Sequence, residues 1–221
     1  MRFKDIFATS DDTQSLGNKF RNKRIADFRS KIESLTKPLN ILDVGGLESF
    51  WVNGGFADDP DYNISILNLN EIPVHYSNFT SLIGDATFLH EFKDGEFDIV
   101  FSNSVIEHLY TKENQIKMAS EICRVGKSYY VQTPNKHFFV EPHYLLPFFQ
   151  YLPANLKYFI LTKTPLSRRK KWNKAEAQQY IDEIRLLSLS EMKELFPEAD
   201  FYMEEFYGMI KSFTAHNFIK E

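Results

Sequence analysis

Short apolar runs that end in small or polar residues recur along the first half of the chain. Residues 39–44 end in a Gly-Gly pair, and residues 63–69, 80–84 and 97–101 are similar runs bounded by Gly, Asp or Asn. Runs of this length and composition are typical of strands buried inside a sheet. We therefore predict four strands in this part of the chain, the first at residues 39–44.

Amphipathic segments flank these runs. Residues 18–35 carry apolar side chains at steps of three to five residues, which predicts a helix ended by Pro38. Thr111 is a candidate N-cap of a second helix that stops at Gly126. A third helix is expected after a Ser-x-x-Glu capping box. The buried face of the second helix is expected to comprise Ile116, Ala119, Ile122 and Cys123. The capping box of the third helix is formed by Ser188 and Glu191.

Three more strands are expected towards the C-terminus, at residues 127–132, 201–206 and 210–218, the last two joined about Gly208. Strands that alternate with helices imply a parallel sheet covered on both faces. A short link between the last two strands implies antiparallel pairing. The predicted class is α/β, with a doubly wound sheet of about seven strands and an antiparallel edge strand.

One segment departs from this alternation. Residues 134–176 are rich in aromatic side chains and are broken by five prolines, which makes them too apolar for a linker and unsuited to one long helix. We expect one domain over residues 1–221, with a helical N-terminal extension at 1–37 and, at 134–176, an insertion that caps the substrate site.

Composition excludes several classes of function. The formal net charge is -4, which argues against general nucleic-acid binding because that needs a basic surface. Cys123 is the single cysteine, so no intramolecular disulfide can form. Residues 1–10 lack the features of a secretory signal, and no apolar run is long enough to span a bilayer. We expect a cytoplasmic protein.

The candidate binding residues stand where the predicted strands end. Ligands of open parallel sheets bind beyond the carboxyl ends of the strands, where the connections diverge. Glycines permit close approach of the backbone, while amides and carboxylates can bond ribose hydroxyls and an adenine amine. The predicted cofactor-binding residues are Asp43, Gly45, Gly46, Asn68, Asp85, Ala86, Ser102 and Asn103.

Three of these segments, taken in order, resemble motifs of the class I S-adenosylmethionine-dependent methyltransferases. They are residues 41–46 (ILDVGG), 84–86 (GDA) and 97–109 (FDIVFSNSVIEHL). The resemblance implies a Rossmann-like fold and S-adenosylmethionine as cofactor, with S-adenosylhomocysteine as product. Two departures stand out: only the first glycine of the family's Gly-x-Gly-x-Gly is in register, and Asn68 stands where an acid is usual.

The candidates for catalysis are His143, His108 and Glu107. A hydroxyl acceptor needs a base to remove its proton, and histidine is the usual base near neutral pH. His143 either serves as that base or pins the fold of the insertion, and we favour the first. For Glu107 and His108, packing and hydrogen bonding at a helix start are the favoured roles. In some ubiquinone-pathway O-methyltransferases the equivalent pair is similar to a metal site, but Ser104 replaces its upstream acid, so we expect no metal.

The acceptor is less defined. Residues 137–147 and 185–187 resemble methyltransferases that accompany surface-glycan assembly, which implies a small-molecule, glycan or glycolipid acceptor. Residues 144–174 combine an apolar run with a basic one and suggest peripheral membrane contact, although an ordinary solvated loop has the same composition. Other hypotheses are a protein or nucleic-acid methyltransferase, a catalytically silent binding module and, more distantly, a dehydrogenase. The sequence leaves the oligomeric state open.

Overall fold

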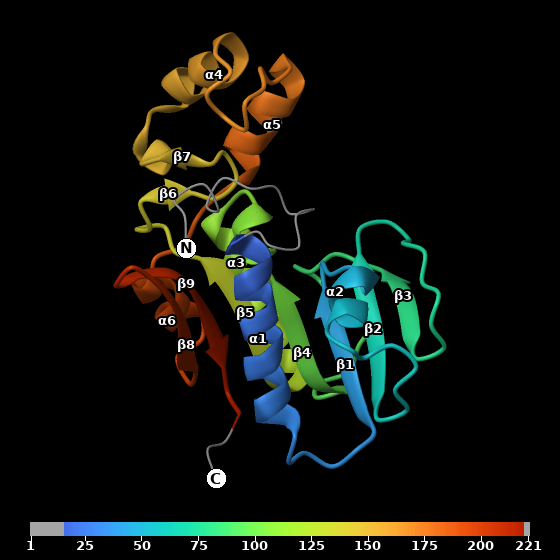
Figure 1. Cartoon of the computed structure of the whole chain (residues 1–221). Helices are drawn as coiled ribbons and strands as arrows, with labels where there is room; N and C mark the ends of the chain where they lie inside the picture. Colours follow the sequence, from blue (N-terminus) through green and yellow to red (C-terminus); the bar gives the residue numbers. More distant parts are fainter. Residues whose placement is uncertain (1–15, 219–221) are drawn as a thin grey trace.

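A mixed sheet of seven strands forms the centre of the computed structural model, which describes residues 16–218 (Figure 1). The strand order is β3-β2-β1-β4-β5-β9-β8. The first five of these strands are parallel, and β9 runs antiparallel to both neighbours, β5 and the edge strand β8. The predicted α/β class is confirmed. The strands are β1 (Leu39–Val44), β2 (Tyr62–Asn68), β3 (Phe79–Ile83), β4 (Phe97–Asn103), β5 (Gly126–Pro134), β8 (Asp200–Phe206) and β9 (Met209–His216).

Helices cover both faces of the sheet, as its alternating apolar side chains require. Ile41 of β1 faces the cluster that contains Phe28 of α1 (Leu16–Ile32) and Trp51 of α2 (Glu48–Asn53). Leu42, the next residue, faces the opposite cluster, to which α3 (Lys112–Val125) and α6 (Leu189–Leu195) contribute. The connections that leave β1 and β4 therefore lie on opposite faces.

The predicted caps are present, but the buried face of α3 was partly wrong. The Thr111 side chain accepts a hydrogen bond from the backbone N–H of Asn114, and Ser188 with Glu191 forms the predicted capping box. Ile116 and Cys123, expected on the buried face, are exposed. The observed buried face is shifted by about one position, because the Gln115 side chain is buried and its amide donates to the backbone carbonyls of Ile106 and Arg185. This face comprises Gln115, Met118, Ala119, Ile122 and Val125.

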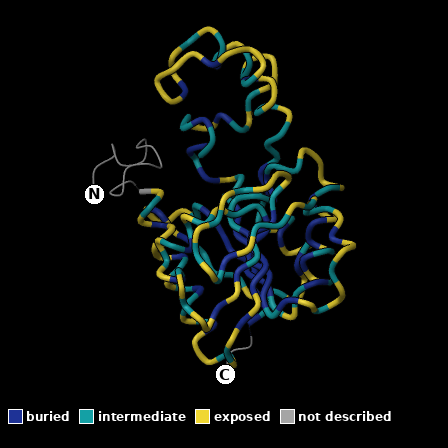
Figure 2. The backbone as a smooth tube through the Cα atoms, turned by 90° about the vertical axis from the view of Figure 1, so that its right-hand side faces the viewer, coloured by how far each residue is buried: buried dark blue, intermediate teal, exposed yellow. Residues whose placement is uncertain are grey.

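The segment between β5 and α6 forms a lobe above the sheet (Figures 1 and 2). It contains β6 (Val140–Glu141), β7 (Leu146–Pro147), the 3-10 helix η3 (Phe149–Tyr151), α4 (Ala154–Lys163) and α5 (Lys174–Glu183). The lobe has an apolar cluster of its own, whose buried members are Tyr144, Phe149, Leu161, Trp172 and Ala177. None of the helices in residues 16–218 combines the length and apolar composition needed to cross a bilayer.

The N-terminal helix is joined to the far side of the sheet by a buried ion pair. Nε and Nη2 of Arg24 lie 3.1 and 2.7 Å from the two carboxylate oxygens of Glu204 on β8. Burial alone raises the pKa of Glu204, but Arg24 outweighs it and the pKa lies below its ordinary value. The predicted extension at 1–37 thus packs on the sheet from residue 16 onwards, while residues 1–15 lie outside the described part.

Arg24→Met is expected to lower the free energy of unfolding by about 3–5 kcal/mol, because it leaves the Glu204 carboxylate buried without its partner. Lys31→Met is the control, since it breaks a 2.9 Å pair with Asp27 near the surface of the same helix and should cost only about 0–1 kcal/mol. Urea unfolding of both variants measures the difference. Equal losses would show that the buried pair does not hold α1 in place.

Candidate functional site

A cavity of about 530 Å³ opens beyond the carboxyl ends of β1, β2 and β4. Its volume is within the range of pockets that hold small ligands. The cavity lies where the connections after β1 and β4 leave on opposite faces, which is the usual ligand site of an open parallel sheet. The loops after the strands supply most of the wall, including Gly45, Asn68, Gly84, Asp85, Ala86, Ser104 and Val105.

The turn after β1 requires both of its glycines. Gly45 has a positive φ of 76°, and a Cβ atom added there would lie 2.7 Å from the Val105 side chain. A Cβ atom on Gly46 would lie 1.6 Å from Oδ2 of Asp43. The Gly46 carbonyl also accepts a hydrogen bond of 2.9 Å from Nδ2 of Asn68. The two glycines therefore fix the turn, although only the first of the family's three glycines is in register.

Asp43 lies under this turn. Its Oδ2 accepts a 2.6 Å hydrogen bond from the indole N–H of Trp51, and its buried Oδ1 has no hydrogen-bond partner among residues 16–218. Burial raises the pKa of Asp43 to about 7, against the opposing effect of the Trp51 hydrogen bond. The residues that the structure describes therefore leave one buried polar atom unsatisfied directly beneath the glycine turn.

The structure divides the predicted cofactor-binding residues into two groups. Four line the cavity, namely Gly45, Asn68, Asp85 and Ala86. The other four, Asp43, Gly46, Ser102 and Asn103, are not among its wall residues. The hydroxyl of Ser102 donates to the backbone carbonyl of Val44, and Oδ1 of Asn103 accepts from Arg24. A role in cofactor binding stays a prediction for all eight residues.

Part of the wall comes from residues that the sequence did not single out. Tyr110 and Asn114 follow the β4 motif, whereas Gln179 and Glu183 belong to α5 in the lobe. The β4 motif could have suggested the first two, because its loop continues to α3. No local pattern marked the second two, since their place depends on how the lobe folds back over the sheet.

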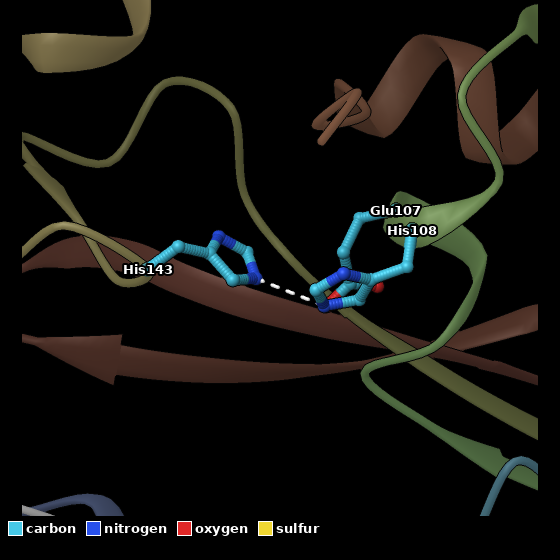
Figure 3. A group of neighbouring side chains, drawn as sticks. All are labelled: Glu107, His108 and His143. Carbon is cyan, nitrogen blue, oxygen red and sulfur yellow. Dashed lines mark hydrogen bonds between the residues drawn. The ribbon is translucent and has the colours of Figure 1, made fainter. Parts of the chain in front are cut away.

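The structure brings His108 and His143 into contact, as Figure 3 shows. His108 ends the short 3-10 helix η2 (Ile106–His108) and lines the cavity. His143 follows β6 and is not among the residues that line the cavity. Their Nε2 atoms are 3.2 Å apart. Each Nδ1 faces a carboxylate: Glu183 lies 2.6 Å from His108, and Glu141 lies 2.7 Å from His143.

Glu107 lies next to this histidine pair and is fully buried. Its Oε2 accepts a 2.9 Å hydrogen bond from the Thr133 hydroxyl, and its Oε1 has no hydrogen-bond partner among residues 16–218. The packing and hydrogen-bonding role predicted for Glu107 explains the contact of Oε2 with Thr133 but leaves the burial of Oε1 unexplained. Burial by itself lowers the pKa of His143, but the carboxylates of Glu141 and Glu107 outweigh burial and raise the pKa above its ordinary value.

Comparison with known proteins agrees with this geometry. Residues 61–129 match the family described as a methyltransferase domain. An uncharacterized protein of Mycobacterium tuberculosis is 38% identical over 53 residues, which are 24% of this chain and 18% of that protein.

Two solved structures share the fold. A S-adenosylmethionine-dependent methyltransferase of Methanosarcina mazei is 15% identical with a TM-score of 0.50, covering 83% of this chain and 93% of that one. The second is a 1,6-didemethyltoxoflavin-N1-methyltransferase of Burkholderia thailandensis, solved with 1,6-didemethyltoxoflavin and S-adenosylhomocysteine bound. It is 10% identical with a TM-score of 0.56, and the match covers 89% of this chain and 76% of that one. The predicted Rossmann-like fold is confirmed, and within it residues 61–129 match the methyltransferase-domain family.

Asp43→Asn is expected to remove a pH dependence of stability. Because the pKa of Asp43 is raised, its contribution to folding is complete below the unfolded pKa near 4 and is lost as pH rises to about 7. Between pH 5 and pH 8 the wild type should lose about 3 kcal/mol more of unfolding free energy than Asp43→Asn, whose amide does not titrate. Urea unfolding at both pH values measures this difference. Parallel losses in the two proteins would contradict the raised pKa.

Proposed function

We propose that this chain transfers a methyl group from S-adenosylmethionine to a hydroxyl of a small-molecule or glycan acceptor. The observation that carries the proposal is the cavity at the ends of β1, β2 and β4, which has a glycine turn at one wall and the His108 imidazole at another. The methyltransferase domain match covers β2, β3 and β4, three of the strands whose ends supply this wall.

Bound S-adenosylmethionine supplies an electrophilic methyl group on its sulfonium. The chain must then align an acceptor oxygen with that methyl group and accept its proton. His108 lines the cavity and Glu183 orients its ring through Nδ1, so the proton would go to Nε2 of His108, the nitrogen that faces His143. The proton would then lie between the two Nε2 atoms, and Glu141, at Nδ1 of His143, would stabilise the positive charge of the histidine pair.

A catalytically silent binding module is the second hypothesis, because the turn after β1 keeps only one of the family's glycines in register. The geometry of the turn weighs against it. Gly45 and Gly46 already provide the positive φ and the close approach that the turn needs. Cofactor binding with no turnover on any acceptor would favour the silent module.

Calorimetry with S-adenosylhomocysteine tests the proposed cofactor site. Asp85→Ala removes a carboxylate from the cavity wall and should weaken binding by about tenfold or more, as expected for a hydrogen bond to a charged group. Glu71→Ala, an exposed acid that does not line the cavity, is the matched control and should bind as the wild type does. The cofactor hypothesis fails if the wild type shows no binding at millimolar concentration.

We also propose that the lobe presents the site to an acceptor held at an anionic membrane surface. The lobe exposes large apolar side chains beside a basic run. Such a combination binds lipid headgroups through charge and the acyl boundary through apolar contact. The exposed apolar residues are Phe148, Tyr151, Leu156, Phe159 and Leu166, and the basic ones include Lys163, Arg169 and Lys171.

Co-sedimentation with vesicles measures this contact. The wild type should bind vesicles that contain phosphatidylserine and should bind less as salt rises, because exposed charges are screened. Phe159→Ser, which removes an exposed apolar side chain of α4, should reduce binding, whereas Phe88→Ser, an equally exposed phenylalanine outside the lobe, should not. Equal binding to neutral and anionic vesicles would contradict the role of the basic run.

A further inference from the structure

We propose that Glu107, His108 and His143 bind a divalent transition-metal ion such as Zn²⁺ beside the cavity. The sequence argued against a metal because Ser104 stands where an upstream acid was needed. The structure supplies a third ligand from another place: His143, 35 residues after His108, enters from the lobe. One donor atom from each of the three residues lies within 4.8 Å of the other two (Figure 3).

The spacing of the two imidazoles suits a shared metal ion. Zn²⁺ binds histidine nitrogen at about 2.0–2.1 Å with tetrahedral angles, which places two ligand nitrogens roughly 3.3 Å apart. The two Nε2 atoms are 3.2 Å apart, with the ring planes inclined at 85°. The histidine pair is therefore already at ligand spacing, and the Glu107 carboxylate, which has an oxygen within 4.8 Å of both histidine donor atoms, would have to move closer to complete the site.

The protons of this pair allow a cation to replace the hydrogen bond between the two rings. The carboxylates of Glu183 and Glu141 face Nδ1 of His108 and of His143, so a neutral ring would carry its proton on Nδ1. When both rings are neutral, the two facing Nε2 atoms present lone pairs to one another. A metal ion satisfies both lone pairs at once, and the carboxylate–histidine–metal arrangement is the usual support of histidine ligands.

Glu107 provides independent evidence for a ligand. Its carboxylate is fully buried, and Oε1 has no hydrogen-bond partner among residues 16–218. A buried carboxylate oxygen is costly unless it is paired or coordinates a metal. Thr133 holds the other oxygen and so orients the carboxylate beside the imidazoles.

The ligand set also identifies the class of metal. Two imidazoles and one carboxylate suit Zn²⁺ and other late first-row ions, whereas Mg²⁺ and Ca²⁺ prefer oxygen ligands alone. Three protein ligands leave a position for water or substrate, as in catalytic zinc sites. If the proposed methyl transfer holds, a metal at this site would take over the role of His108 in removing the proton, because an acceptor oxygen on the open position would have a lowered pKa and would lose its proton to solvent more easily.

Titration of the chelator-stripped chain with ZnCl₂ in a calorimeter tests the site. One equivalent should bind, and His143→Ala and Glu107→Gln should each weaken binding by at least about tenfold. Glu141→Gln, which leaves all three ligands in place, should weaken it as well. His137→Ala is the matched control, since this exposed histidine of the same segment contacts Tyr151 and not the cluster, and it should change nothing.

Two further measurements separate the outcomes. MgCl₂ should give no binding, and Co²⁺ should give a visible absorption band that His143→Ala abolishes while circular dichroism shows that the variant is folded. Absence of Zn²⁺ binding at about 100 μM, or equal binding by wild type and folded His143→Ala, would overturn the metal site. The calorimetry with S-adenosylhomocysteine is independent, so the proposed methyl transfer can stand if the metal site fails.

Discussion

The gap between β1 and β4 is the constraint on which the candidate site depends. These neighbouring parallel strands send their connections to opposite faces of the sheet, so no chain crosses the space beyond their carboxyl ends. The turn at Gly45 and the loop at Ser104 therefore both contribute to the wall of one cavity. Because the register aligns the strand ends, residues distant in sequence reach the same space without any long connection.

The lobe meets this gap through a row of polar contacts, while Phe138 and Val140 at its base pack against Phe20 and Phe206. Its buried apolar cluster is separate from the two clusters of the sheet. Contact with the site passes from Glu183 to His108, then to His143 and Glu141, so three of the four members belong to the lobe. Anything that changes this chain of groups, such as a bound cation, would also change how firmly the lobe holds the cavity wall.

The sequence predicted local structure well and long-range contacts poorly. The strand at 39–44 and the Ser188 capping box depend on neighbouring residues, and both were found as predicted. The face of α3 was misplaced by one position because the apolar pattern cannot show that Gln115 is buried for two backbone hydrogen bonds. The contact between His108 and His143 was beyond prediction, since it depends on a fold that returns 35 residues later.

Buried acids distinguish structural from functional positions in this chain. Glu204 is buried but fully paired with Arg24 and Ser212, which marks it as a structural group. Asp43 and Glu107 each keep one buried oxygen without a hydrogen-bond partner in residues 16–218. Folding alone would favour an amide or an apolar side chain at both positions, because an unpaired carboxylate is costly to bury. One of these acids lies under the glycine turn and the other beside the histidine pair, and a positively charged ligand at either place would offset that cost.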